Sequence, residues 1–374
     1  MNFDLSDEQQ VLGGLAQQIF GDLSTIERIT ELQTRDGFDA TLWSELAKAG
    51  ILGLCVAEEH GGLAMHMVEL SLVLEQQGRY IAQVPLWSSS IAAMTVAEFA
   101  SQELQNQVLP GVCAGTTILS TALANFGAND SMNPSVEAID VIETKEGGIR
   151  LIGSKPAVPY AQHAHYVVVS AKRANGSIVL ALVDTDARGV TITPVEGSDR
   201  QPQANMEIDV VVPTSHVISG LTSDGREALR WMHEHSLVAL CAIQLGVAQG
   251  SIAITAEHVK TRHQFGKPLS AQQAVAVRAA DAYITTEAMR VTTLNAAWQL
   301  AEGFDARQDV LVAMYWATEG GHSVVLAGQH LHGGVGADIS YPVHRFFLWG
   351  IQISTQLGGA SQHLARLGKL IASK

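Results

Sequence analysis

The sequence predicts an α+β fold in which a central antiparallel β-sheet or barrel separates two helical regions. Three observations support this prediction. Apolar residues recur with helical spacing up to about residue 115, alternate with polar residues from 117 to about 215, and recur with helical spacing from 226 onward. We therefore expect an N-terminal all-helical domain over residues 1–115, a central β domain over 116–218 and a C-terminal four-helix bundle over 219–374.

Helix start and stop signals mark the N-terminal region. Ser6 followed by Gln9 predicts a capping box, and the apolar residues of 11–19 then fall on one helical face. Asp39 stands where a second helix needs an N-cap, and Gly50 stands where that helix needs a left-handed stop. These signals predict separate helices joined by short loops.

Short β-branched runs separated by turn residues mark the central region. The clearest is 206–212, where apolar residues alternate with Glu207 and Asp209, as in a strand with one buried face. Gly147-Gly148 predicts a hairpin, and Asn175-Gly176 predicts another with a type I′ turn. The pattern is that of an antiparallel sheet.

Four long helical segments follow, near 226–260, 271–302, 307–331 and 343–372, and they predict a bundle. The nearly uncharged stretch Leu237–Ala248 is about a dozen residues long, shorter than the roughly 20 that cross a bilayer. We interpret it as part of a core helix and expect no membrane insertion.

Composition limits the function classes. Lys and Arg total 23 against 37 Asp and Glu, a net charge of −14 that disfavours nucleic acids and anionic membranes. With 16% charged and 47% apolar residues in 374, the chain has little charge to cover its surface, so we expect burial against other subunits.

The acidic N-terminal residues lack signal-peptide features, so we expect a cytoplasmic protein. The three cysteines are widely spaced and form no CxxC, which fits a reducing cytoplasm rather than a metal site.

The first segment that could carry chemistry is a polar break between two C-terminal helices. It contains Arg262, Phe265 and a Gly-Lys-Pro loop, and is followed by Gln273. A guanidinium at a helix end can bind a phosphate bidentately, while an aromatic side chain packs on a ligand ring or a partner. An ordinary interhelical loop with a basic C-cap is the alternative interpretation.

The second segment is the glycine-rich run 330–336, which begins at His330 and includes Gly333 and Gly334. Glycines let backbone N–H groups approach a phosphate closely. The run lacks the preceding strand and βαβ context of a dinucleotide fingerprint, so it does not predict a Rossmann site.

Together these motifs resemble the acyl-CoA dehydrogenase family. The two breaks occur in that family's order, Tyr341-Pro342-Val343-His344-Arg345 follows them, and Glu58–Gly62 matches its first domain. The resemblance covers the whole chain. It implies a flavoenzyme in which a glutamate removes the α-proton of an acyl-CoA thioester while hydride leaves the β-carbon for FAD. It also implies that six residues reach the adenine and pyrophosphate of an FAD seated mainly in a neighbouring subunit: Arg262, Phe265, Gln273, His330 (where the family usually has Gln), Gly333 and Gly334.

The catalytic glutamate of the family has no match at its usual place. The Glu-Gly-Thr or Glu-Gly-Ser element reads Leu357-Gly358-Gly359 here, and leucine cannot accept a proton. Some relatives, including steroid and isovaleryl enzymes, carry the base on the first long helix of the bundle, which corresponds to Ser236. Glu234 is two residues away and points about 200° from that position on a helix. We therefore expect no catalytic residue in this chain.

The flavin-ring pocket also departs from the family. Leu123–Asp130 replaces Thr-Glu-Pro-Gly-x-Gly-Ser-Asp, and Ala157-Val158-Pro159 replaces the Trp-Ile-Thr segment that covers the ring. Proline has no N–H and alanine has no ring. His233-Glu234-His235 lacks the HExxH spacing, so no metal site is expected.

The six residues matched to the adenine and pyrophosphate of a neighbour's FAD form a half-site for that cofactor. A chain that has this half-site but no base resembles the non-catalytic β subunit of the α2β2 acyl-CoA dehydrogenases of sterol side-chain degradation. The resemblance implies a homologous catalytic partner subunit, FAD as cofactor, a steroid side-chain acyl-CoA thioester as substrate, a role in steroid or cholesterol catabolism, and an electron-transfer flavoprotein-type acceptor. Two alternatives stay open. One is a homotetramer with Glu234 or another displaced acid as base, and the other is a flavin-free scaffold subunit.

Overall fold

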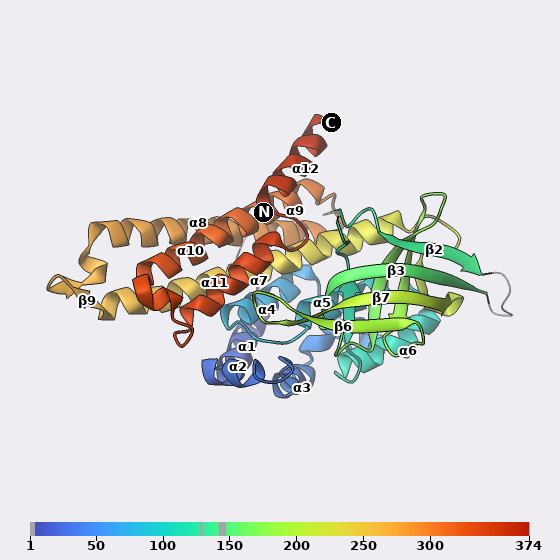
Figure 1. The fold of residues 1–374 in the computed structure, drawn as a ribbon, viewed down its shortest axis with the longest axis horizontal. Helices are drawn as coiled ribbons and strands as arrows, with labels where there is room; N and C mark the ends of the chain where they lie inside the picture. The colour runs from blue at the N-terminus through green and yellow to red at the C-terminus, as the bar shows by residue number, and fades with distance from the viewer. Residues whose placement is uncertain (1–3, 128–129, 142–146, 374) are drawn as a thin grey trace. The chain divides into compact units, whose positions relative to one another are not determined.

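The computed structural model describes residues 4–127, 130–141 and 147–373 (Figure 1). Helices precede the strands Leu119–Ser219, and helices follow from Arg226, so the predicted fold class is confirmed. The chain forms two compact units. The bundle unit contains the residues up to Glu31, then Met67–Ala82 and the residues from Leu237 onward; the sheet unit contains Leu32–His66 and Gln83–Ser236.

The N-terminal helices begin at the predicted caps. At the start of α1 (Asp7–Leu23), the Gln9 N–H donates to Ser6 Oγ over 3.2 Å, and the Ser6 N–H donates to Gln9 Oε1 over 3.0 Å. Asp39 Oδ1 accepts two backbone N–H groups of α3 (Ala40–Lys48), and Gly50 follows that helix with φ +75°. Both predicted caps and the left-handed stop are confirmed.

Because the capping box satisfies two N–H groups, Ser6→Ala is expected to lower the free energy of unfolding by about 0.5–1 kcal/mol. Ser6→Asp keeps an acceptor at the cap and is the matched control, expected to stay close to the wild type. Urea denaturation of the three proteins measures the difference, and equal midpoints for all three would contradict the role of the cap.

The sheet unit contains one eight-stranded sheet in the order β6-β7-β3-β2-β4-β5-β8, with β1 also paired to β4. The strands are β1 (Leu119–Ala122), β2 (Val136–Val141), β3 (Gly148–Pro159), β4 (Tyr166–Lys172), β5 (Ile178–Asp184), β6 (Val190–Glu196), β7 (Pro202–Pro213) and β8 (Val217–Ser219). Most pairs are antiparallel, as expected. β1 and β2 instead run parallel to β4, one after the other along the same edge, so the sheet is mixed.

The hairpin at Asn175-Gly176 exists, but its turn is not type I′. Only Gly176 has a positive φ, of 84°, and its N–H donates to Arg173 O. Asn175 lies outside the left-handed region, and its side chain accepts the Ser177 N–H two residues on, over 2.9 Å. The predicted turn after β2 lies partly in 142–146, outside the described residues.

The bundle unit contains helices from three parts of the chain: α1, α4 (Met67–Arg79), α8 (Gln273–Ala301), α9 (Arg307–Tyr315), α10 (Gly321–His332), α11 (Val343–Thr355), α12 (Ala360–Ala372), most of α2 (Ile26–Leu32) and the later part of α7 (Arg226–Thr261). α10 packs against both α8 and α11 (Figure 1). The third predicted helix is interrupted by the π-helical turn Trp316–Gly320. The fourth is interrupted at Leu357 and Gly358, which have φ of +56° and +118°.

Helix α7 is the long apolar helix expected from the sequence. Within the described residues it alone is long and apolar enough to cross a membrane, and 78% of its most apolar window is buried. Gly246 lets α4 approach closely, because a Cβ there would lie 1.8 Å from Glu75 O. This burial supports the interpretation of Leu237–Ala248 as part of a core helix.

Candidate functional site

The first predicted break forms a short hairpin at the end of α7. β9 (His263–Gln264) pairs with β10 (Lys267–Pro268), and the Leu269 N–H donates to Arg262 O over 2.9 Å. The turn residues Phe265 and Gly266 have φ of +55° and +76°, which is a type I′ turn. A phenylalanine in this conformation is unusual, and its side chain is 93% exposed. The hairpin therefore presents an aromatic ring outward.

The second predicted break follows the last turn of α10. His330 is exposed on that turn, and Gly333 and Gly334 are exposed after it. Gly333 has φ +60° and ψ −136°, and a Cβ added to either glycine would meet nothing within 4 Å. The backbone of this turn is therefore open to a ligand. The Gln329 amide donates to Gly336 O and holds the far side of the turn.

A stacked pair of histidines joins the two breaks. His258 lies one turn before the end of α7, and His332 is the last residue of α10. Their ring centroids are 4.2 Å apart with 28° between planes, and the Tyr341 ring lies 5.2 Å from that of His332. Arg262 is close enough to His258 to contribute, after burial and His332, to lowering its pKa. The two segments therefore belong to one site in the bundle unit.

The six residues predicted to bind FAD come from three segments of the bundle unit. Arg262 and Phe265 come from the hairpin, and His330, Gly333 and Gly334 come from the turn after α10. Gln273 is exposed as the first residue of α8. Among the described residues, the Arg262 guanidinium has no hydrogen bond or ion pair of its own. An unpaired guanidinium at the same site as an exposed glycine turn can bind a diphosphate.

His258, His332 and Tyr341 are site residues that the sequence motifs did not predict. A signal existed, because His258 precedes Arg262 by one helical turn and His332 directly precedes Gly333. The stack itself joins positions far apart in the chain, so no local pattern predicts it.

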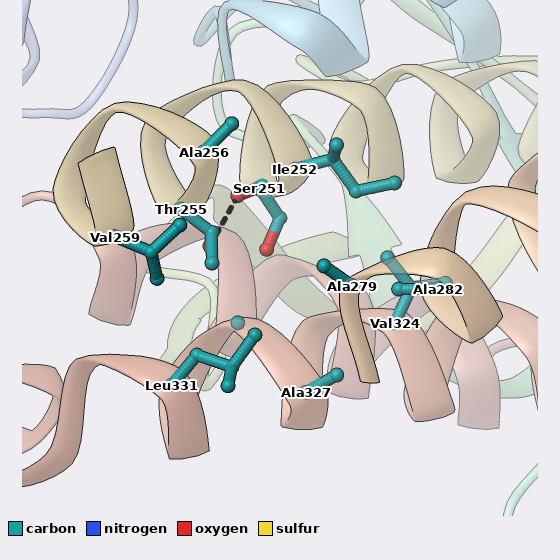
Figure 2. Close-up of a pocket in the computed structure, with 11 residues that line it drawn as sticks. Ser251, Ile252, Thr255, Ala256, Val259, Ala279, Ala282, Val324, Ala327 and Leu331 are labelled. Atoms are coloured by element: carbon teal, nitrogen blue, oxygen red, sulfur yellow. Dashed lines mark hydrogen bonds between the residues drawn. The ribbon is translucent and has the colours of Figure 1, made fainter. Parts of the chain in front are cut away.

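A small cavity lies between α7, α8 and α10 (Figure 2). Its volume is about 40 Å³, far below the roughly 300–1,000 Å³ of ligand pockets, so it is no site for an acyl thioester. The Ser251 hydroxyl points into it from α7 and has no hydrogen-bond partner among the described residues. Gly328 forms part of the wall, and a Cβ there would lie 2.6 Å from Ser251 Oγ.

Because of this contact, Gly328→Ala alone is expected to lower stability by about 1–2 kcal/mol. In a Ser251→Ala background the same change should cost nearly nothing, since the closest atom is gone and the new methyl group partly fills the cavity. A double-mutant cycle measured by urea unfolding tests the coupling. Additive effects of the two substitutions would contradict this account of the cavity.

The expected base positions hold no proton acceptor. Leu357 is buried and left-handed, and Gly358 O after it accepts from His363 Nε2 over 3.0 Å. Ser236 is fully buried, and its hydroxyl donates to Met232 O over 2.7 Å. Glu234 is half-buried and has interactions of its own. Neither Leu357 nor Ser236 can therefore remove a proton.

In the sheet unit, the segment matching the flavin-ring pocket is tied to the protein itself. Asn125 Oδ1 accepts from the buried Lys155 Nζ over 2.8 Å and from the Ser135 N–H over 3.2 Å. Its Nδ2 donates to Asp130 O over 2.9 Å. Ala128 and Asn129 lie outside the described residues. The Asn125 amide therefore orders its own loop.

The segment that replaces the ring cover is a bulge in β3. The pairing of β3 with β7 shifts between Lys155 and Val158, and Ala157 has φ +47°. The Ala157 N–H donates to Asn205 Oδ1 over 3.0 Å, and Val158 is 1% exposed. This segment offers neither an aromatic ring nor a hydroxyl to a flavin.

Lys155 is the most deeply buried charged side chain of this region. Its Nζ contacts Asn125 Oδ1 and, over 3.3 Å, Ser170 Oγ. Burial lowers the pKa of Lys155 from 10.5 to about 7, with no opposing charge to raise it. The amine is therefore partly neutral near physiological pH.

Neither a metal site nor a second phosphate site is supported by the structure. Within the described residues no group of three or more potential metal ligands occurs, and none of the three cysteines forms a disulfide. An open hollow of about 430 Å³ in the sheet unit is lined by Arg35, Arg200, Asp36 and Glu196 among others. Its two cations and two anions balance, so it has no net attraction for a phosphate.

Comparisons with known proteins agree over the whole chain. Residues 6–116 match the model "Acyl-CoA dehydrogenase, N-terminal domain", and residues 223–368 match "Acyl-CoA dehydrogenase, C-terminal domain". The acyl-CoA dehydrogenase FadE27 of Mycobacterium tuberculosis is 34% identical over 382 residues, covering 100% of this chain and 99% of the relative.

Two solved structures are similar throughout. The Tcur3481-Tcur3483 steroid ACAD, in a variant form, has a TM-score of 0.91 at 43% identity and 98% coverage of both chains. The ChsE4-ChsE5 complex from Mycobacterium tuberculosis has a TM-score of 0.93 at 34% identity and 100% coverage of both chains. Acyl-CoA dehydrogenases are oxidoreductases that act on CH–CH groups with FAD as cofactor. With the fold, the two matched domain models and a relative 34% identical over the whole chain, the chain belongs to the acyl-CoA dehydrogenase family.

Proposed function

We propose that this chain is the non-catalytic, FAD-completing subunit of a heteromeric acyl-CoA dehydrogenase. The complex would introduce an α,β double bond into an acyl-CoA thioester of a steroid side chain, as one step of steroid or cholesterol catabolism. The observation that carries the proposal is an asymmetry: the residues proposed to face the nucleotide are present, with His330 in place of the family's usual Gln, whereas Leu357 and Ser236 occupy the positions of the base.

The residues of the half-site fit the phosphate end of FAD. The unpaired Arg262 guanidinium would neutralise the pyrophosphate. The Gly333 N–H already donates to His330 O, so the open space at Gly333 and Gly334 would let the pyrophosphate approach the backbone of this turn closely. Phe265, 93% exposed, would pack on the adenine side or on the partner subunit. His330 and Gln273 would complete the polar contacts. When bound, FAD supplies the hydride acceptor.

The ring end of FAD fits this chain poorly. The residues that replace the family's ring contacts are used internally: Asn125 orders its own loop, and Ala157 is held by Asn205. The isoalloxazine would therefore lie in the partner's pocket, where the partner's glutamate removes the α-proton. This chain would orient the cofactor and close the site.

The names of the similar structures support a heteromer and a steroid substrate. One is a steroid ACAD named for two chains, and the other is a complex of ChsE4 with ChsE5. An α2β2 assembly with an electron-transfer flavoprotein-type acceptor in the cytoplasm is the corresponding expectation for this chain. The three cysteines, none of them in a disulfide, are compatible with a reducing compartment.

The alternatives make different predictions. A homotetramer needs a base, and Glu234 is the nearest acid to the helix position used by steroid enzymes. Ser236 and Glu234 lie on different faces of α7, since they are two residues apart in a helix. A flavin-free scaffold would retain no FAD in any complex.

The test compares two purifications. Produced alone, the chain is expected to bind little flavin and to show no dehydrogenase activity with a steroid side-chain CoA thioester. Co-expressed with a homologue that carries the catalytic glutamate, it should form a yellow, active complex. Flavin-dependent activity of the chain alone would contradict the proposal, and a flavin-free complex would favour the scaffold.

A further inference from the structure

The two nucleotide-facing segments are linked by side chains that the half-site itself does not require. His258 on α7 and His332 on α10 stack at 4.2 Å, and Tyr341 adds an edge contact at 6.2 Å from His258. All three belong to the bundle unit. The stack joins the end of one helix to the end of another.

The His332 ring is held in one orientation. Its Nδ1–H donates to Gly328 O over 2.7 Å, and the residue is only 5% exposed. Its Nε2 is buried and has no hydrogen-bond partner among the described residues, so that nitrogen carries a lone pair rather than a proton. Burial lowers the pKa of His332, which favours the neutral ring.

The surroundings of His258 also favour a neutral ring. Burial, His332 and the Arg262 cation all lower its pKa. Two neutral imidazoles stack without charge repulsion. Each ring is directly connected to one side of the half-site, because Arg262 follows His258 by one helical turn and Gly333 follows His332 in the chain.

We propose that His258 and His332 are positioning residues, whose stack holds the Arg262 hairpin and the Gly333–Gly334 turn in the arrangement that binds the diphosphate of FAD. This inference rests on the proposed half-site. Neither ring has to touch FAD. Without the stack, the two segments would move independently, and part of the binding free energy would be spent on ordering them.

The test uses the flavin complex formed with the base-containing homologue and measures its affinity for FAD. His258→Ala removes the stacking ring and should weaken FAD binding about 2- to 12-fold, the range that one aromatic pair supplies. His258→Phe keeps a ring that can stack on His332 and should stay within about twofold of the wild type. His322→Ala, at an exposed histidine earlier on α10, is the matched control and should change nothing.

A second measurement needs neither flavin nor partner. Hydrogen exchange of the chain alone should be faster in residues 262–268 and 333–337 of His258→Ala, and should return toward the wild-type rate in His258→Phe. Thermal unfolding of each variant checks that the chain is folded. Unchanged exchange in His258→Ala would overturn the positioning role.

FAD binding by the His258 and Arg262 variants separates failure of the positioning role from failure of the proposed half-site. If His258→Ala binds FAD normally while Arg262→Ala binds it weakly, the stack has no positioning role and the half-site stands. If Arg262→Ala also binds FAD normally, the half-site is wrong. If His258→Phe is as weak as His258→Ala, stacking is not the cause, and the inference is overturned.

Discussion

Lys155→Met is expected to stabilise the chain by about 2–4 kcal/mol at pH 7. Lys155 is 0% exposed, and burial lowers its pKa from 10.5 to about 7. A shift of this size corresponds to about 4 kcal/mol of destabilisation at pH 7, part of which the contacts with Asn125 and Ser170 offset. Methionine has similar length and no charge to bury.

The sign of the pH dependence follows from the lowered pKa. Between pH 7 and 10.5 the unfolded chain holds a proton on Lys155 that the folded chain has released, so wild-type stability gains from this group as pH rises. This gain in stability is complete above pH 10.5 and is lost as the pH falls to about 7. The advantage of Lys155→Met should therefore shrink steadily toward pH 10.

Lys172→Met is the matched control. Lys172 Nζ also donates to an asparagine carbonyl, Asn133 Oδ1 over 2.8 Å, but at an exposed contact on the same sheet. Its replacement should change stability by less than about 0.5 kcal/mol. Urea unfolding from pH 7 to 10 measures all three proteins. A Lys155→Met variant that is less stable than the wild type at pH 7 would contradict the expectation that burial of this amine costs stability.

The second large effect is expected at the half-site. Arg262→Ala should weaken FAD retention by the complex by about 1.5–3 kcal/mol, or roughly 10- to 150-fold, because it removes a charge-assisted contact. Stability of the chain should hardly change, since among the described residues the guanidinium makes no hydrogen bond or ion pair. Flavin fluorescence after dilution or gel filtration measures the retained cofactor.

Arg188→Ala is the matched control for charge. Arg188 is exposed in the sheet unit and lies outside both segments proposed to face the nucleotide. Equal flavin loss from the Arg188 and Arg262 variants would point to a general electrostatic effect. Full retention in the Arg262 variant would remove Arg262 from the cofactor site.

Local signals in the sequence predicted much of the fold. Ser6, Asp39 and Gly50 mark helix ends because their side chains or backbone freedom act within a few residues. The parallel pairing of β1 and β2 with β4 depends on contacts between distant segments, and β6 (Val190–Glu196) has no buried residue to produce an apolar alternation. Such features cannot be predicted from a local window.

In the candidate site, too, some residues were predicted from local motifs and others were missed. Arg262 and Gly333 were predicted by motif, and the structure brings their segments together through a contact between two helix ends. The positive φ of Phe265 was missed, because a type I′ turn usually carries Asn or Gly there. The burial of Lys155 was missed as well, because it sits beside a bulge that interrupts the strand alternation.

The flavin content of the purified complex tests the central claim most directly. If this chain completes the site of a catalytic partner, absorbance of released FAD against protein should give one FAD for every two polypeptides, and the chain purified alone should be colourless. One FAD for every polypeptide, or a yellow and active preparation of this chain alone, would contradict the account.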